Sequence, residues 1–250
     1  MLKETRNLVA FLTIIPVGMD RECSSDAARN MHLFPIVGGL IGFLAGVFAW
    51  LLLQILPPLA AGSLTMGFIL LLTGLHHADG LLDFGDGIMH LGPAEGKIQV
   101  MHDKQTGAGG LALGSITILT TAMCISSLSM DNVIQGLVVA ETSAKLAMVI
   151  GAWAGRSAHK GVNTYFVDAM HGRRRVMRLM VTLILSFGIV IRAFWLAGFF
   201  GVAAGLAAAL IMVKVSNRHF GGVTGDVFGA MNEIGRMASL VTVLATLRWV

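Results

Sequence analysis

Charged residues are scarce in this sequence, and that scarcity limits the kind of protein it encodes. Only 13% of the 250 residues are charged, 55% are hydrophobic, and the mean hydropathy is +0.77. Soluble domains carry about 25% charged residues. The composition therefore excludes an ordinary soluble domain and indicates an integral membrane protein.

Cysteine and aromatic residues are also few. The two cysteines, Cys23 and Cys124, are too few for a disulfide framework and lack the spacing of a metal site. The net charge is +4, but aromatic residues make up only 7% and the basic residues are scattered among apolar runs. Nucleic-acid binding requires a basic patch. We therefore expect no nucleic-acid partner.

Long apolar runs fill most of the chain. A bilayer core of roughly 30 Å is crossed by about 20 apolar residues in a helix. The runs that satisfy this length are 33–56, 59–75, 111–130, 133–154 and 176–213, the last long enough for two helices with a turn near Arg192; 237–250 is a short additional candidate. We predict a single all-α domain, 1–250, embedded in the lipid bilayer with six to seven transmembrane helices. Residues 1–18 are expected to form an interfacial helix.

The polar residues are concentrated in four segments between these runs. They are 1–32, 76–110, 155–178 and 214–236, and they contain most of the Lys and Arg and all acids except Asp131 and Glu141. Alternating spans place all four at one membrane face, and the positive-inside rule places that face in the cytoplasm. We predict a multi-pass protein of the inner (cytoplasmic) membrane whose active face is cytoplasmic.

The segment 76–110 opens with closely spaced acids in HHADGLLDFGDGIMH. Asp79, Asp83 and Asp86 lie at i, i+4 and i+7, so a helix presents all three on one face. Stacked carboxylates repel one another unless a cation lies between them, and oxygen ligands suit Mg²⁺ or Mn²⁺. These three aspartates are the predicted metal ligands. The alternative is a solvated loop whose acids face water.

Other residues in the same stretch have roles that the pattern leaves open. Gly80, Gly85 and Gly87 alternate with the acids and permit close approach of a backbone or of a bulky anionic ligand. His76 and His77 are either metal ligands or interfacial side chains that form hydrogen bonds.

A glycine-rich turn follows in VMHDKQTGAGGLALG. Its glycines, Gly107 first, can present backbone N–H groups to an anion where the next span begins. Phosphates and Mg²⁺ are commonly bound together, so a turn beside a metal helix favours phosphate binding. The alternative is a flexible turn at the start of a span.

Further ionisable residues lie near or within the spans. Asp226 and Glu233 are seven residues apart and share a helical face, so acids from two segments are placed to share a metal. Arg156 directly follows the span that contains Glu141 and Lys145. Charges inside a span are costly and mark either a site or an internal ion pair, and these two readings stay open.

Together these features favour phosphoryl transfer at one membrane face. A metal neutralises the charge of a phosphate or pyrophosphate, and a carboxylate positions or deprotonates the attacking hydroxyl. A small-molecule transporter is a rival class, but we find no inverted repeat, and the acids lie at one face rather than at the midplane. A structural scaffold is a weaker alternative, since it gives no reason for the aspartate spacing.

Five stretches along the chain resemble one enzyme family. They are FLTIIPVG, HLFPIVGGLIG, TGLHHADGLLDFGDGI, MHDKQTGAGGLAL and GGVTGDVFGAMNE. In this order they resemble the cobalamin synthase family, the adenosylcobinamide-GDP ribazoletransferases. The resemblance implies an Mg²⁺-dependent membrane enzyme that joins adenosylcobinamide-GDP to α-ribazole or its 5′-phosphate and releases GMP. A CDP-alcohol-type phosphotransferase is an alternative by analogy with the acidic helix, although its characteristic spacing is absent.

The resemblance also implies roles for particular residues. It supports the three aspartates of 76–90 as metal and pyrophosphate ligands, and it makes Asp103 and Asp226 the catalytic candidates. Substrate binding is assigned to Arg156 and to four other positions of the motifs. These four are His102, Lys104, Gly107 and Thr224.

The chain departs from the family pattern at one motif. His102 stands where Lys is usual and Gln105 stands where Arg is usual, while Lys104 offers a replacement charge. Which residue holds the phosphate therefore stays open. Self-association into a homo-oligomer is also left open.

Overall fold

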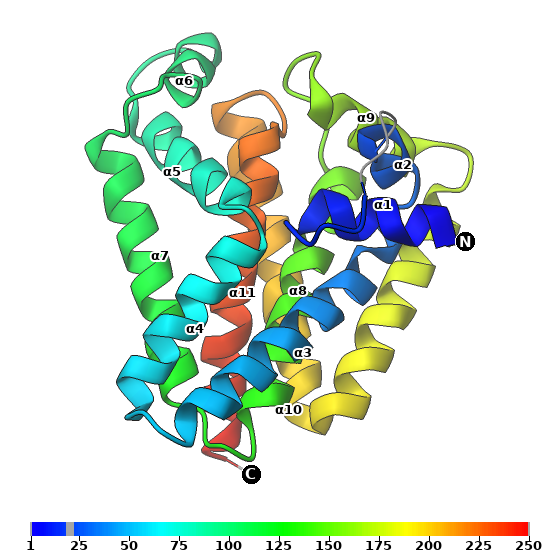
Figure 1. The fold of residues 1–250 in the computed structure, drawn as a ribbon. Helices are drawn as coiled ribbons and strands as arrows, with labels where there is room; N and C mark the ends of the chain where they lie inside the picture. The colour runs from blue at the N-terminus through cyan, green and yellow to red at the C-terminus, as the bar shows by residue number, and fades with distance from the viewer. Residues whose placement is uncertain (1, 19–22, 250) are drawn as a thin grey trace.

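The chain folds as a bundle of helices, in agreement with the all-α prediction. The computed structural model describes residues 2–18 and 23–249, and over these residues it has eleven α-helices, a short 3-10 helix and one isolated β-bridge (Figure 1). The helices are α1 (Leu2–Leu12), α2 (Cys23–Arg29), α3 (Phe34–Leu53), α4 (Pro58–Leu72), α5 (His76–Met89), α6 (Ala94–Met101), α7 (Ala108–Ser126), α8 (Val133–Ala154), α9 (Val162–His171), α10 (Arg175–His219) and α11 (Gly225–Leu247), with the 3-10 helix at Met31–Leu33.

Helix α8 forms the centre of the bundle. It is buried along nearly its whole length and packs against α3, α10 and α11. Small residues make these contacts close. A Cβ at Gly201 would lie 2.8 Å from the Val139 side chain, and one at Gly235 would lie 2.9 Å from the Ala147 side chain. The long helices therefore share one continuous core in which glycine permits tight packing.

Four helices of the described chain are long and apolar enough to cross a membrane. They are the 3-10 helix with α3, α7, α8 and α10, and α4 with α5 makes a fifth if the two count as one broken span. The predicted runs therefore correspond to helices, and the chain has the character of a multi-pass membrane protein. Length and composition alone do not give the predicted six to seven transmembrane helices.

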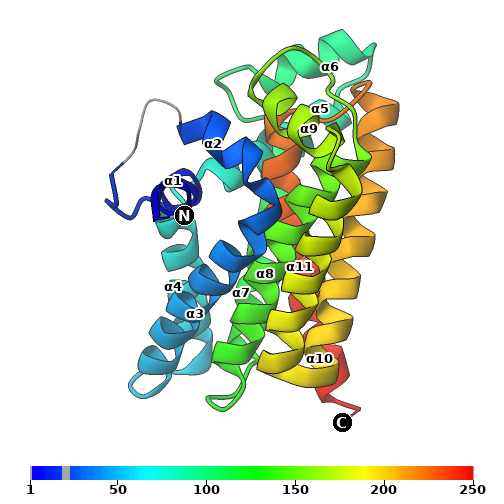
Figure 2. The same ribbon diagram turned by 90° about the vertical axis from the view of Figure 1, so that its right-hand side faces the viewer.

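Helix α10 is bent back on itself near the predicted turn. Phe194 and Trp195 leave helical geometry, and Trp195 has φ +42°. Figure 2 shows the two halves of α10 running side by side along the bundle. The prediction of two helices with a turn near Arg192 is therefore confirmed, with the break two residues further on.

The last helix differs from its prediction. The run 237–250 was a short candidate, but α11 begins at Gly225 and extends to Leu247. Its first turns contain Glu233 and Arg236, which are buried in the bundle. The shared helical face predicted for Asp226 and Glu233 agrees with this helix, but the apolar run 237–250 missed its start. Charges that neutralise one another inside the bundle depress hydropathy without ending a helix.

A sharp turn separates α4 from α5. Gly74 and Leu75 both have positive φ, at 67° and 63°, and the two helix axes differ by 95°. The N–H of Leu75 donates to the carbonyl of Leu70 at 2.9 Å, and the N–H of Gly74 donates to that of Leu71 at 3.0 Å. This pairing is a Schellman cap, which ends α4 and turns α5 across the end of the bundle.

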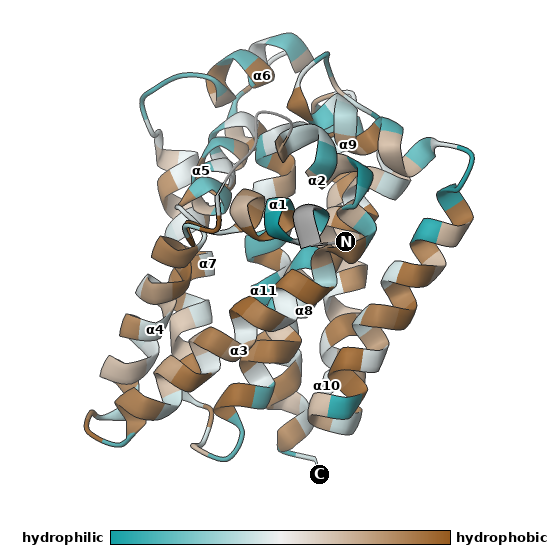
Figure 3. Ribbon diagram, turned by 45° about the vertical axis from the view of Figure 1, so that its right-hand side comes forward, coloured by the Kyte–Doolittle hydropathy of each residue, from teal (hydrophilic) through white to brown (hydrophobic). Residues whose placement is uncertain are grey.

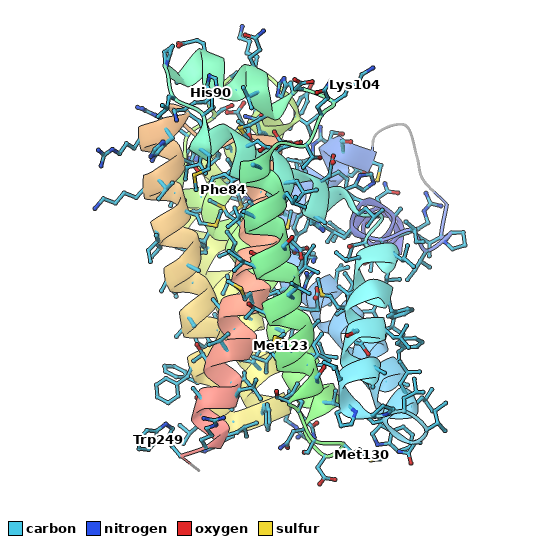
Figure 4. The ribbon with its side chains drawn as sticks, turned by 90° about the vertical axis from the view of Figure 1, so that its left-hand side faces the viewer. Phe84, His90, Lys104, Met123, Met130 and Trp249 are labelled. Carbon is cyan, nitrogen blue, oxygen red and sulfur yellow. The ribbon has the colours of Figure 1, made fainter. Side chains whose placement is uncertain are left out.

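The polar segments lie at one end of the molecule. Figure 3 shows hydrophilic residues gathered around α2, α5, α6 and α9, whereas the long helices below them are mostly hydrophobic. Figure 4 places His90 and Lys104 at this end and Met130 and Trp249 at the other. Helix α1 lies across the bundle beside the polar end, as an interfacial helix would (Figure 1). The prediction that the polar segments share one face is borne out by this arrangement.

Candidate functional site

Helix α5 carries the predicted metal ligands and is packed tightly between α11 and α7. A Cβ at Gly80 would lie 2.8 Å from the carbonyl oxygen of Asp226, and one at Gly85 would lie 2.8 Å from that of Gly109. The glycines among the acids therefore permit close backbone approach, one of the two uses expected for them. Because α5 meets α11 at Gly80, Asp79 and Asp83 lie beside Asp226.

Asp86 holds the glycine-rich turn in place. Its two carboxylate oxygens accept hydrogen bonds from the N–H groups of Gly107, at 2.7 Å, and Gly110, at 2.8 Å. These groups are at the N-terminus of α7, where unpaired donors and the helix dipole favour a negative charge. The turn thus presents its N–H groups to an anion, and in this structure that anion is the Asp86 carboxylate.

Asp83 experiences the repulsion of its acidic neighbours. Burial, together with the negative charges of Asp226, Asp79 and Asp86, raises its pKa from 3.8 to about 7. Like charges disfavour the ionised form of a carboxylic acid, and a cation placed among them would reverse the effect. Four carboxylates from α5 and α11 therefore form one electrostatic group, which we call the acid cluster.

The acid cluster suits a divalent cation in its chemistry. Its donors are all carboxylate oxygens, which Mg²⁺ prefers, and the negative charges of Asp226, Asp79 and Asp86 add to burial in raising the pKa of Asp83. Among the described residues, no three His, Cys, Asp or Glu side chains already have the closeness of a metal site. The side chains that could hold a cation here are the four carboxylates of the acid cluster, Asp79, Asp83, Asp86 and Asp226.

Two loops bring histidines next to this cluster. The ring of His102, at the end of α6, lies 5.7 Å from the ring of His159, in the loop after α8. His102 also interacts electrostatically with Asp226. The segments that contain the predicted residues 102, 156 and 226 therefore converge at one end of the bundle.

The loop after α8 is tied directly to the segment before α11. Arg156 donates from Nε to the carbonyl of Gly221 at 2.7 Å, and its own carbonyl accepts from the N–H of Val223, also at 2.7 Å. Asn163 donates to the carbonyl of Val223 at 2.9 Å and to Ser157 Oγ at 2.7 Å. Arg156 thus anchors the segment before α11 with one nitrogen, while the rest of its exposed guanidinium remains available to a ligand.

The remaining predicted residues differ in their surroundings. Thr224 is buried and caps α11, because its hydroxyl accepts from the N–H of Val227 at 3.2 Å. Asp103 is exposed, and its carboxylate accepts from the N–H of Gln105 at 3.3 Å. Lys104 is exposed on the same loop, at the polar end of the molecule (Figure 4). Thr224 therefore supports the position of Asp226, whereas Asp103 and Lys104 are free to meet a ligand.

The charges within the bundle form a separate network. Glu141 pairs with Lys145 at 3.4 Å and with Arg236, which also pairs with Glu233. Asn232 accepts from Lys145 at 2.6 Å and donates to Glu233 at 2.9 Å. All four charged side chains are fully buried. Of the two readings left open for Glu141 and Lys145, the structure supports the internal ion pair, and Glu233 belongs to this network rather than to the acid cluster.

Sequence reasoning missed two kinds of residue. Asn163 joins two loops of the site but stands alone in the sequence, so no pattern marks it. Arg236 belongs to the buried network, and its position directly before the apolar run 237–250 was the available signal. His77 is buried, and it is not one of the side chains of the acid cluster.

The fold and site define a multi-pass helical membrane protein with an acid-rich site at the polar end of its bundle. Residues 4–244 match the family model described as cobalamin-5-phosphate synthase. The chain therefore belongs to this family.

Relatives over nearly the whole length support the same assignment. The chain is 36% identical to the adenosylcobinamide-GDP ribazoletransferase of Methanocella arvoryzae, covering 96% of this chain and 94% of the relative. It is 34% identical to that of Thermococcus kodakarensis, covering 98% and 99%, and 32% identical to that of Methanococcoides burtonii, covering 94% and 89%. No solved structure matches the chain.

Proposed function

We propose that the protein is an adenosylcobinamide-GDP ribazoletransferase that acts in cobalamin biosynthesis. A hydroxyl of α-ribazole, or of its 5′-phosphate, attacks the cobinamide-linked phosphorus of the pyrophosphate. The bond from that phosphorus to the bridging oxygen breaks, GMP leaves with the electron pair, and the hydroxyl proton passes to a base. The observation that carries the proposal is the convergence of α5 and α11 acids in a chain that belongs to this family over residues 4–244.

The proposed roles follow from the placement of each side chain. Asp103 is exposed on the loop that begins beside Asp226, so it is placed to accept the hydroxyl proton. Lys104, His102 and Arg156 supply positive charge around the pyrophosphate. The N–H groups at the start of α7 are held by Asp86, so the turn is ordered before substrate arrives.

We further propose that the acid cluster binds Mg²⁺. Bound Mg²⁺ would neutralise charge on the pyrophosphate and on the leaving GMP. Asp79, Asp83 and Asp226 would hold it, with Asp86 at the edge. This assignment rests on the all-oxygen donor set and on the closeness of the four carboxylates, whose repulsion, added to the larger effect of burial, raises the Asp83 pKa to about 7.

We also propose seven membrane crossings with the acid cluster on the cytoplasmic side of the inner membrane. The crossings are α3, α4, α7, α8, the two halves of α10, and α11, while α5 lies across the cytoplasmic end. This proposal is supported by the bend at Phe194 and Trp195. It is also supported by the gathering of hydrophilic residues at the end that contains the acid cluster (Figure 3), since the polar segments contain most of the Lys and Arg.

The decisive experiment measures GMP release by purified protein in detergent. The substrates are adenosylcobinamide-GDP and α-ribazole, with Mg²⁺ or with EDTA, and a CDP-activated alcohol serves as the control donor. We expect release that requires both α-ribazole and Mg²⁺. Release without α-ribazole would indicate a hydrolase, and turnover of the CDP donor alone would indicate a phospholipid synthase. A folded protein with no turnover would return the transporter to consideration.

A further inference from the structure

A cavity of about 510 Å³ lies at the N-terminal ends of α5 and α11. It is lined by residues of α1, α2, α8 and α9, by Thr73 before α5, and by the first residues of α5 and α11. Its walls include Phe11, Phe166 and Phe228, whose rings form a connected group with centroids 5.4 and 6.2 Å apart. The volume is in the range of small-molecule sites, roughly 300 to 1,000 Å³.

Most polar side chains of the cavity wall are exposed or already engaged. Ser24 and His76 are exposed to solvent, and the Asn163 amide donates to Ser157 Oγ and to the carbonyl of Val223. Thr13 donates its hydroxyl to the carbonyl of Val9 at 2.7 Å, and Thr73 donates to that of Ile69 at 3.0 Å, so both are engaged with their own helices. His77 differs, because its Nδ1 is buried without a hydrogen-bond partner and its side chain lines the cavity. A ligand that fills this space should be flat and apolar, with one group that pairs with His77.

The cavity shares its first residues with the acid cluster. His76 lines the cavity three residues before Asp79 on α5, so these two side chains lie on one face of the helix. Gly225 lines the cavity directly before Asp226 on α11. The cavity therefore adjoins the acid cluster at the N-terminal ends of both helices. Of the groups in the two substrates, guanine requires several polar partners, and a corrin ring is far larger than the space. The benzimidazole of α-ribazole is flat and apolar and has one unsubstituted ring nitrogen.

We infer that this cavity binds the aromatic base of α-ribazole, with His77 Nδ1–H donating to its free ring nitrogen and the ribose directed toward the acid cluster. The inference rests on the proposed function for the identity of the ligand. It assigns the nucleophile to the side of α5 that faces α1 and α9, and it leaves the opposite side, near α6 and α7, for the pyrophosphate.

The test measures the affinity of the protein for α-ribazole by equilibrium dialysis. The protein is in detergent with EDTA, and the corrinoid substrate is left out. A Cβ at Gly225 meets nothing within 4 Å, so Gly225→Leu can add bulk to the cavity wall without a clash at its Cβ. Gly67→Leu is the matched control, since Gly67 is also helical with open space around its Cβ. We expect Gly225→Leu to weaken binding at least tenfold and Gly67→Leu to leave it unchanged. A riboside that lacks the two ring methyl groups should recover part of the loss.

His77→Phe keeps an aromatic side chain and removes both ring nitrogens, so it should weaken α-ribazole binding about tenfold. It should raise the KM for α-ribazole and leave that for adenosylcobinamide-GDP unaltered. Unchanged affinity and KM in both variants, with normal GMP release, would overturn the inference and leave the proposed function standing. A co-purified lipid lost only from Gly225→Leu, with α-ribazole binding intact, would also overturn it. Binding that follows the pattern without GMP release would support the cavity and reject the proposed reaction.

Discussion

The molecule contains two groups of ionisable residues that differ in how their charge is balanced, and α11 contributes to both. In the buried network, Glu141 and Glu233 are matched by Lys145 and Arg236, and every one of these side chains is shielded from solvent. In the acid cluster, Asp83 is surrounded by three other carboxylates and remains partly exposed.

The difference teaches what each group needs from outside the chain. The network is neutral by itself, so it is complete without a ligand and serves to join α8 to α11. The acid cluster has no internal cation to match it and gains stability from one that arrives from solution. The following changes act on one group and spare the other, so they test whether this separation holds.

The largest effect is expected from Asp83→Asn. It removes a proposed Mg²⁺ ligand from the centre of the acid cluster, and we expect GMP release to fall about 1,000-fold or more, as several kcal/mol of transition-state stabilisation is lost. Because the substitution also removes repulsion, the melting temperature in EDTA should be equal to or above that of the wild type. Glu95→Gln, an exposed acid on α6 at the same end, is the control. Activity close to the wild-type rate in Asp83→Asn would refute the metal assignment.

Arg236→Leu should mainly lower stability, whereas Asp83→Asn mainly lowers activity. It leaves Glu141 and Glu233 in the bundle with reduced compensation, and breaking a buried pair in this way costs about 3–5 kcal/mol. We expect a large loss of unfolding free energy in detergent, measured by denaturant titration, whether or not Mg²⁺ is present. Arg248→Leu, at the exposed end of α11, provides the comparison. If both variants were equally stable, the network would not be what holds α8 and α11 together.

Gly80→Ala tests the contact that brings the two helices of the acid cluster together. The added Cβ would lie 2.8 Å from the Asp226 carbonyl oxygen, so α5 and α11 must separate. Overpacking of this kind costs about 1–3 kcal/mol, and it should lower both the melting temperature and GMP release. Gly67→Ala has open space around the new Cβ and should be neutral or slightly stabilising. Equal behaviour of the two variants would show that the acid cluster tolerates a wider spacing.

The acid helix could be predicted from the sequence because the pattern that indicates it lies within one short segment. The i, i+4, i+7 spacing of Asp79, Asp83 and Asp86 needs only helical geometry, and the glycines between them indicate close packing. The partner of that helix was less accessible. Asp226 was recognised as an acid on the same face, but its position beside Gly80 depends on how α11 packs, which no local pattern specifies.

The buried network shows which contacts the sequence alone does not predict. The pairing of Glu141 with Lys145 follows from their spacing on one helix. The pairing with Arg236 joins residues 95 positions apart, and the charges of α11 lowered its hydropathy enough to hide the start of the helix. Long-range neutralisation is a property of the packed bundle, so it cannot be read from a hydropathy window.

The smallest expected effect concerns pH and belongs to the acid cluster alone. The pKa of Asp83 is raised from 3.8 to about 7, so between these values the folded protein holds a proton that the unfolded chain has lost. The unfolding free energy of the Mg²⁺-free protein should therefore decrease as pH rises through this range. Mg²⁺ must displace that proton below pH 7, so its affinity at pH 6 should be about tenfold weaker than at pH 8.

Thermal unfolding with and without Mg²⁺ at pH 6, 7 and 8 measures this dependence. The Mg²⁺-induced rise in melting temperature should grow up to about pH 7 and then level off, because Asp83 is ionised above its pKa. Asp83→Asn should abolish both the rise and its pH dependence, whereas Arg236→Leu should lower the melting temperature by a similar amount at every pH. A pH dependence that followed Arg236 instead of Asp83 would mean that the two groups are coupled through α11, and the separation between a self-balanced network and a ligand-dependent cluster would not hold.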